Sequence, residues 1–298
     1  MFEQIIGNEP NKKYLEKALL ENRLGQTVLF SGMEGIGKSL FAGEVASQIL
    51  KGNRFDFHAF SPEGKSGLYS IETIREMIDL DRAAPFSGNA KVFVLEDVDQ
   101  MLPASANALL KTLEEPSSHS TFLLITSKIQ RILPTILSRC TVLHFYPIPY
   151  DSIASFLKNK GLPLSLAKIA HGSIGRALQW EIGEQIKAQL FPLLGASRSF
   201  PELNEQLGTI ITFIEESKEE DVRSYQRKVQ WLFELLRMWY RDQQALQMGL
   251  SSDLLFFPDL KKGDFLDPRF EQKLEDSLLA YYRNIKLSSS LLPIFLTE

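Results

Sequence analysis

One segment near the start of the chain has the residue types and spacing of a phosphate-binding loop. Residues 32–39 read Gly-Met-Glu-Gly-Ile-Gly-Lys-Ser and fit the pattern G-x-x-x-x-G-K-[ST]. In such a loop the glycines let backbone N–H groups converge on phosphate oxygens, while the lysine adds a positive charge and the hydroxyl can ligate Mg²⁺. We expect ATP with Mg²⁺ to be held by Gly32, Gly35, Gly37, Lys38 and Ser39, with Ser39 as the magnesium ligand.

A pair of acids at the end of an apolar run could also do chemistry. The run Lys-Val-Phe-Val-Leu at 91–95 leads directly into Glu96 and Asp97. Open parallel sheets bind ligands at the carboxyl ends of their strands, so these carboxylates are expected beside the phosphate loop. One acid would hold Mg²⁺ through its water shell and the other would orient the attacking water. A solvated acidic strand end is the alternative interpretation.

The elements that must position these residues alternate between apolar runs and helical patterns. Apolar runs predict strands at 27–30, 57–60, 92–95, 122–125 and 142–145. Helical spacing is found over 8–24, 40–50, 70–78 and 104–115. Such alternation is typical of a parallel sheet with helices on both faces. The sequence therefore predicts an α/β nucleotide-binding domain over residues 1–148.

From about residue 149 onward only helical patterns remain. We expect a group of short helices over 149–197 and an all-α domain over 198–298, with a boundary where Gly and Ser cluster. Apolar residues at spacings of three and four along 222–239 predict a long helix. Such a stripe is typical of a domain's own core, and a subunit interface is the alternative.

Composition excludes several classes of protein. The chain has 298 residues with 33 Lys and Arg against 37 Asp and Glu, and without a basic excess it is not expected to hold DNA tightly by itself. The single Cys140 excludes an internal disulfide, and with four histidines it does not make a zinc site. The sequence has neither a membrane-spanning run nor a signal-peptide pattern, so we expect a cytoplasmic bacterial protein without zinc.

Five segments taken together resemble one protein family. In chain order they are the phosphate loop, the acidic strand end, the helical sequence NALLKTLEEP at 107–116, the apolar run 122–127 and the triplet Ser-Arg-Cys at 138–140. Over about residues 1–180 this order resembles the AAA+ clamp-loader subunits of bacterial DNA polymerase III, and within them the delta-prime branch. The resemblance implies an AAA+ domain, a helical lid and a helical collar that joins a ring of related subunits.

The resemblance also implies roles for single residues. Thr126 or Ser127 would sense the γ-phosphate, and Arg176 in the lid would contact the nucleotide. Arg139 would be an arginine finger that acts in trans, because a guanidinium stays charged and donates in a planar fork to phosphoryl oxygens. A cation that favours a helix C-terminus is the alternative interpretation of Arg139. The implied partners are the motor and delta subunits and, through the complex, the sliding clamp and primed DNA.

Two departures from the family pattern indicate a stator rather than a motor. Active members end the second motif with Asp-Glu, whereas this chain has Glu96-Asp97. One methylene moves a carboxylate by roughly 1.5 Å, and a displacement of about 1 Å can lower a rate on the order of 100-fold. In the stretch Gly-Ser-Ile-Gly-Arg at 172–176 the arginine comes one residue later than in motor subunits. We therefore expect a delta-prime-type stator whose own ATPase activity is weak or absent.

Two rival functions use the same phosphate loop. One is an active gamma-type motor subunit of the same family. The other is a P-loop kinase of nucleoside monophosphates, which needs a lid rich in arginine, whereas residues 130–180 contain only Arg131, Arg139 and Arg176. Many bacterial relatives hold a four-cysteine zinc module between the first two motifs, and residues 52–70 of this chain contain no cysteine.

Overall fold

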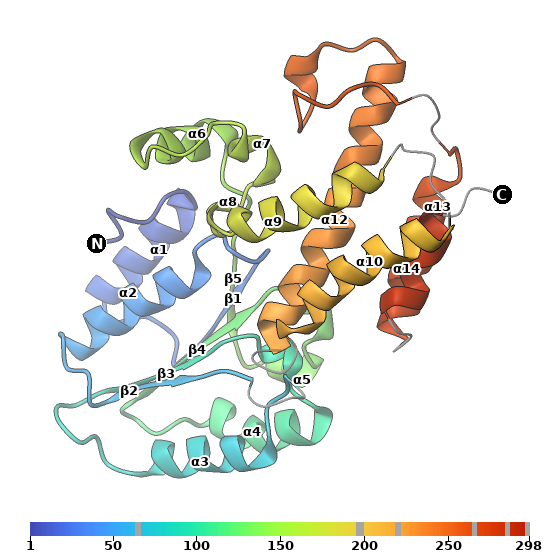
Figure 1. Cartoon of the computed structure of the whole chain (residues 1–298). Coiled ribbons are helices and arrows are strands. Elements are labelled where there is room, and N and C mark those ends of the chain that lie inside the picture. The colour runs from blue at the N-terminus through green and yellow to red at the C-terminus, as the bar shows by residue number, and fades with distance from the viewer. Residues whose placement is uncertain (63–66, 195–199, 218–221, 264–266, 284–286, 296–298) are drawn as a thin grey trace. The chain divides into compact units, whose positions relative to one another are not determined.

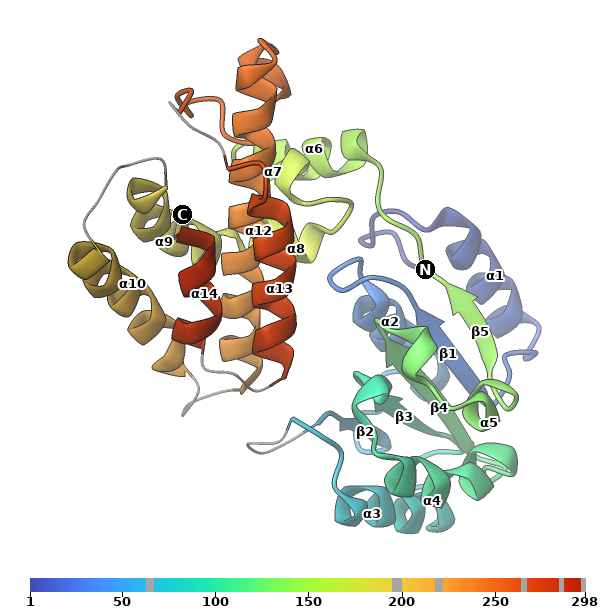
Figure 2. The same cartoon turned by 90° about the vertical axis from the view of Figure 1, so that its right-hand side faces the viewer.

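The computed structural model describes residues 1–62, 67–194, 200–217, 222–263, 267–283 and 287–295. The chain forms two compact units, Met1–Leu178 and Gln179–Glu298. Figures 1 and 2 show that the first unit combines a sheet with helices and that the second is helical. The predicted boundary at residues 197 and 198 lies outside the described residues, and the division into three domains stays a prediction.

The first unit is built on a parallel sheet of five strands in the order β2-β3-β4-β1-β5. The strands are β1 (Thr27–Ser31), β2 (Phe57–Phe60), β3 (Lys91–Leu95), β4 (Ser120–Thr126) and β5 (Thr141–His144). The three inner strands β1, β3 and β4 are buried almost throughout, which is why their sequences are continuously apolar. The predicted α/β class is confirmed, and a strand is present at each predicted position.

Helices cover both faces of this sheet (Figure 1). They are α1 (Glu9–Leu20), α2 (Lys38–Leu50), α3 (Ile71–Arg82), α4 (Pro103–Glu114) and α5 (Pro134–Leu137), with short 3-10 turns η1 (Val98–Gln100) and η2 (Ile129–Arg131). Successive strand residues point to opposite faces. Thus Val28 and Phe30 of β1 pack in the core with α1 and α2, while Leu29 packs in the core with α3 and α4.

Three short helices complete the first unit after β5. They are α6 (Tyr150–Asn159), α7 (Leu166–Ile169) and α8 (Ile174–Leu178). The α6 helix packs on α7 and buries Ile153 and Leu157. The segment between β5 and α6 is tied to the turn before α8, because the N–H of Ile148 donates a hydrogen bond of 2.8 Å to the carbonyl of Gly172. This bond holds the start of α8 close to the end of the sheet.

The second unit is organised around one long helix. Its elements are α9 (Trp180–Leu190), η3 (Phe191–Leu193), α10 (Phe200–Glu215), α12 (Val222–Gln247), η4 (Ser252–Leu254), α13 (Phe270–Tyr282) and α14 (Leu287–Phe295). The α12 helix packs on α9, α10 and α13 and buries Val229, Leu232 and Leu236. The described part of the apolar stripe, from Tyr225 to Trp239, therefore lies in the unit's own core, as the first interpretation predicted. Of all the helices described here, none is long and apolar enough to cross a membrane.

Candidate nucleotide site and a distant arginine

The phosphate loop connects β1 to α2 at the carboxyl edge of the sheet. Ser31 ends β1 and Lys38 begins α2, so the loop leads directly into a helix N-terminus. The N–H of Gly32 donates a hydrogen bond of 3.3 Å to the carbonyl of Thr126, which ties the loop to the end of β4. Backbone N–H groups at a helix start favour anions, so this part of the loop is suited to phosphate.

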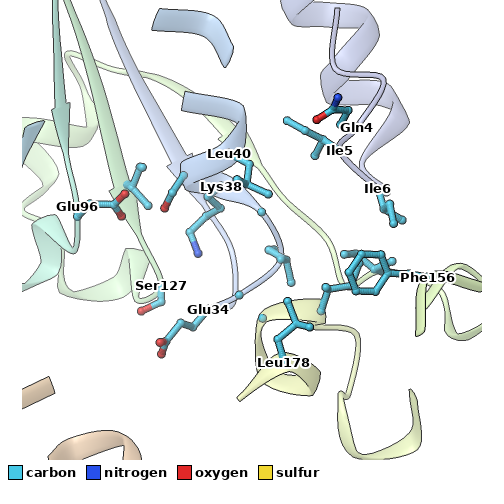
Figure 3. Close-up of a pocket in the computed structure, with 18 of the residues that line it drawn as sticks. Gln4, Ile5, Ile6, Glu34, Lys38, Leu40, Glu96, Ser127, Phe156 and Leu178 are labelled. Atoms are coloured by element: carbon cyan, nitrogen blue, oxygen red, sulfur yellow. The ribbon is translucent and has the colours of Figure 1, made fainter. Parts of the chain in front are cut away.

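A cavity of about 350 Å³ lies beside the loop (Figure 3). Its polar lining includes Glu34, Lys38, Ser39, Glu96, Asp97 and Ser127. Its apolar lining consists of Ile5, Ile6, Ile36, Leu40, Ile125, Ile148, Phe156, Ile174 and Leu178. In Figure 3, Lys38, Glu96 and Ser127 lie toward one side, and Ile6, Phe156 and Leu178 lie toward the other. A nucleotide combines charged phosphates with a flat base, and these two sides fit the two parts.

Lys38 is folded back on its own loop. Its Nζ donates hydrogen bonds of 2.7 Å to the carbonyls of Gly32 and Met33, and the residue is only 6% exposed. Burial lowers the pKa of the Lys38 ammonium, an effect that the carboxylates of Glu34 and Asp97 partly offset. The cation predicted to meet the phosphates therefore lies at the loop, held there by carbonyl oxygens.

Glu96 and Asp97 follow β3 and line the same cavity, as predicted from the acidic strand end. Asp97 precedes η1 and has φ 49°, in the left-handed region that aspartate adopts more readily than most non-glycine residues. Asp97, the second acid of the exchanged pair Glu96-Asp97, thus has an uncommon backbone conformation. This conformation sets the direction in which the Asp97 side chain leaves the strand end.

Thr126, one of the two expected γ-phosphate sensors, does not line the cavity. Its hydroxyl is fully buried, donates a hydrogen bond of 2.7 Å to Asp99 Oδ1 and accepts one of 3.0 Å from the N–H of Lys128. Ser127 follows it and lines the cavity. The hydroxyl of Thr126 is thus used inside the protein, and Ser127 is the one of the two that a nucleotide in the cavity could contact. The sensor role of either residue stays a prediction.

Asp99 is a residue that the sequence analysis missed. It lies in η1 directly after the acidic pair and supports the end of β4 through Thr126. A third acid two residues after Asp97 was a visible signal, but its partner could be identified only once β3 and β4 were known to be neighbours.

The start of α8 packs directly on the phosphate loop. The N–H of Gly175 donates a hydrogen bond of 2.8 Å to the carbonyl of Gly35. A Cβ on Gly175 would lie 2.7 Å from Gly35 Cα, and one on Gly35 would lie 2.3 Å from Ser173 Oγ. The half-buried Arg176 follows Gly175, and its backbone N–H donates a hydrogen bond of 3.1 Å to Ser173 Oγ. Arg176 is absent from the described lining of the cavity, and its contact with nucleotide stays a prediction.

Arg139 lies at the end of the sheet where the strands begin, whereas the phosphate loop lies at the end where they finish. It precedes β5, whose first residue Thr141 pairs with Val28 near the start of β1, whereas the loop leaves β1 after Ser31. The length of β1 separates the two ends, roughly 13 Å at about 3.3 Å per residue. The Arg139 guanidinium is bound on its own side of the sheet, where Nη2 donates to Glu114 Oε2 at 2.6 Å.

Comparison with known proteins finds similarity to subunits of DNA polymerase III. The family model described as "DNA polymerase III, delta subunit" matches residues 7–149. The chain is also 26% identical over 271 residues to DNA polymerase III subunit delta' of Bacillus subtilis, and the match covers 83% of this chain and 80% of that protein. The chain is thus similar to clamp-loader subunits of DNA polymerase III over most of its length. The resemblance predicted from the motifs is therefore confirmed.

Other clamp-loader relatives are longer than this chain. Subunit tau/gamma of Haemophilus influenzae is 32% identical over an alignment of 207 residues, and the match covers 59% of this chain and 30% of that protein. The chain thus spans about a third of the length of this relative and of subunit tau of Escherichia coli. Among solved structures, a gamma subunit-related protein of Thermotoga maritima aligns with a TM-score of 0.49 at 18% identity, covering 94% of this chain and 97% of that one.

Proposed function

We propose that this chain is a delta-prime-type stator of a clamp loader, which gives Arg139 to the ATP site of a neighbouring motor subunit. The observation that carries the proposal is the place of Arg139 at the amino edge of the sheet, across from the chain's own phosphate loop. An arginine held there by Glu114 cannot reach a nucleotide in the cavity of the same chain. A partly exposed guanidinium at this edge is suited to phosphates presented by another subunit.

The chain's own cavity is proposed to bind ATP with Mg²⁺. Lys38 and the loop N–H groups would hold the phosphates, and the apolar residues around Phe156 would contact the base. Magnesium is usually bound through one or two carboxylates together with phosphate oxygens, so Ser39 and Glu96 suffice on the protein side. The described residues contain no group of three or more His, Cys, Asp or Glu side chains that could hold a metal without the nucleotide.

Weak hydrolysis at this site is part of the proposal. The exchanged acids place a longer carboxylate first and a shorter one second, and Asp97 leaves β3 with a left-handed backbone. A carboxylate about 1 Å from its catalytic position can lower the rate on the order of 100-fold. Nucleotide bound here would therefore support the conformation of the subunit more than it would drive the cycle.

The partners follow from the same proposal. The chain would assemble with motor and delta subunits into a hetero-oligomeric ring that opens the sliding clamp on primed DNA. The kinase alternative lacks support, because Arg139 lies across the sheet from the phosphate loop and Arg176 is absent from the described cavity lining.

The proposal is tested in a clamp loader reconstituted with the motor and delta subunits of the same organism. Arg139→Ala should lower the ATPase stimulated by clamp and DNA strongly, up to about 10³–10⁵-fold by comparison with arginine fingers of GTPases. Lys38→Ala should lower it much less. Arg131→Ala, at an exposed arginine of η2, is the matched control and should have no effect. A silent Arg139→Ala together with a crippling Lys38→Ala would identify a gamma-type motor instead.

A further inference from the structure

One carboxylate on a neighbouring helix holds the guanidinium of Arg139. Nε and Nη2 both donate to Oε2 of Glu114, at 3.0 and 2.6 Å. Nη1 donates to the carbonyl of Thr135 at 2.9 Å, with a longer contact of 3.4 Å to Ser138 Oγ. Glu114 and Arg139 are 25 residues apart in the chain, so this arrangement joins two separate elements of the fold.

The helix that carries Glu114 is anchored in the core. Glu114 is the last residue of α4, and the preceding residues Leu109 and Leu113 are buried in the core against the sheet. The carboxylate itself remains exposed at the helix end. Its neighbour Glu115 is exposed too and lies beyond the last helical residue. A helix anchored in the core therefore presents one of two adjacent acids to the arginine.

We infer that Glu114 is a positioning residue that fixes the direction of the Arg139 guanidinium for the neighbouring ATP site. Arginine side chains sample many rotamers, and ordering them at the moment of binding opposes the reaction. A guanidinium carries five N–H groups, of which three are taken by Glu114 and Thr135, while Nη1 also makes the long contact to Ser138 Oγ. The second N–H of Nη2 and the weakly bound one of Nη1 can donate to phosphoryl oxygens while Glu114 still accepts from Nε and Nη2.

This inference rests on the proposed function of Arg139 as a finger. A merely structural role for Glu114 would predict a lower melting temperature when its carboxylate is lost. Exposed ion pairs contribute little to stability, so we expect the melting temperature of the chain to stay nearly unchanged. A positioning role instead predicts a slower reaction at the neighbouring subunit, because small displacements of a catalytic group have large effects on rate.

The experiment compares Glu114→Ala, Glu114→Gln and the matched control Glu115→Gln in the reconstituted clamp loader. Glu114→Ala should lower the maximal stimulated ATPase rate about 10- to 100-fold, with the KM for ATP unchanged. Glu114→Gln should lose less, because its amide keeps a carbonyl oxygen that can accept from Nε and Nη2. Glu115→Gln should behave as the wild type.

A second measurement follows the contact itself in the isolated full chain. Nitrogen-15 NMR should show slow solvent exchange of the Arg139 Nε–H in the wild type and fast exchange in Glu114→Ala. Fast exchange in the wild type would overturn the inference. So would a rate loss in Glu115→Gln equal to that in Glu114→Ala, because the effect would then be one of net charge.

The two proposals fail in different ways. If Glu114→Ala turns over like the wild type while Arg139→Ala is strongly impaired, the finger stands and the positioning role of Glu114 is wrong. If Arg139→Ala also leaves the stimulated ATPase rate unchanged, Arg139 is not an arginine finger. The positioning role of Glu114 is then wrong too, even if NMR shows that the ion pair exists.

Discussion

Gly175 and Gly35 meet backbone to backbone, through a hydrogen bond of 2.8 Å from the N–H of Gly175 to the carbonyl of Gly35. The contact brings the first turn of α8 onto the phosphate loop, with a Cβ on Gly175 only 2.7 Å from Gly35 Cα. Gly35 also has φ +74°, a conformation that a residue with a side chain rarely adopts. The shape of the loop thus depends on two glycines from distant parts of the chain.

Gly175→Ala is expected to separate α8 from the loop and to destabilise the chain by about 1–3 kcal/mol, because the added methyl overlaps with backbone atoms. Gly43→Ala is the matched control. Gly43 lies within α2 with open space around a Cβ, so alanine there should stabilise by about 0.4–1 kcal/mol. Urea denaturation of both variants checks the sign of each change. A Gly175→Ala variant at least as stable as the wild type would show that the contact is not retained in solution.

Thr126→Val should destabilise the chain without a direct effect on nucleotide affinity. Valine cannot donate to Asp99 Oδ1, and an unsatisfied buried acceptor costs about 1–3 kcal/mol. Ser127→Ala should do the reverse, with little change in stability and weaker binding of ATP relative to ADP. Urea titrations and calorimetric binding of both nucleotides separate the two residues. Loss of discrimination between ATP and ADP in Thr126→Val alone would assign the sensor role to Thr126 and not to Ser127.

Cys140 is expected to be unreactive in the folded chain. Burial raises the pKa of its thiol to about 12, and the thiolate is the reactive form. Alkylation by iodoacetamide near pH 8 should therefore be slow in the native protein and fast after unfolding in guanidinium chloride, as mass spectrometry can follow. The folded chain keeps a proton that the unfolded thiol releases above its ordinary pKa of about 8.5, so stability should fall as pH rises from there toward 12. Equal alkylation rates before and after unfolding would contradict the burial of this thiol.

Leu232→Glu should unfold the second unit. Leu232 is 1% exposed in the core around α12, and an unpaired buried carboxylate costs several kcal/mol. Gln230→Glu adds the same charge to an exposed position of the same helix and should leave the structure intact. Far-UV circular dichroism during heating distinguishes the two. A Leu232→Glu variant that keeps its helical signal and loses only ring assembly would assign the stripe to a subunit interface.

The sequence by itself determined the parts of this protein that depend on short-range patterns. Continuous apolar runs identified the strands, because inner strands of a parallel sheet are buried on both faces. The spacing of Gly32, Gly37, Lys38 and Ser39 identified the phosphate loop, since all of its chemistry lies within eight consecutive residues. The Ser-Arg-Cys triplet and NALLKTLEEP indicated the similarity to clamp-loader subunits for the same reason.

Only the tertiary structure decided how distant segments meet. The pairing of β4 with its neighbouring strands directs Thr126 toward Asp99 and leaves Ser127 at the cavity. The residue types threonine and serine do not by themselves predict which of the two faces the cavity. The crossover from α4 through β4 to β5 brought Glu114 to Arg139 at the amino edge of the sheet. Such contacts depend on strand order and helix packing, which are properties of the whole fold, because residues far apart in the chain become neighbours only when the sheet assembles.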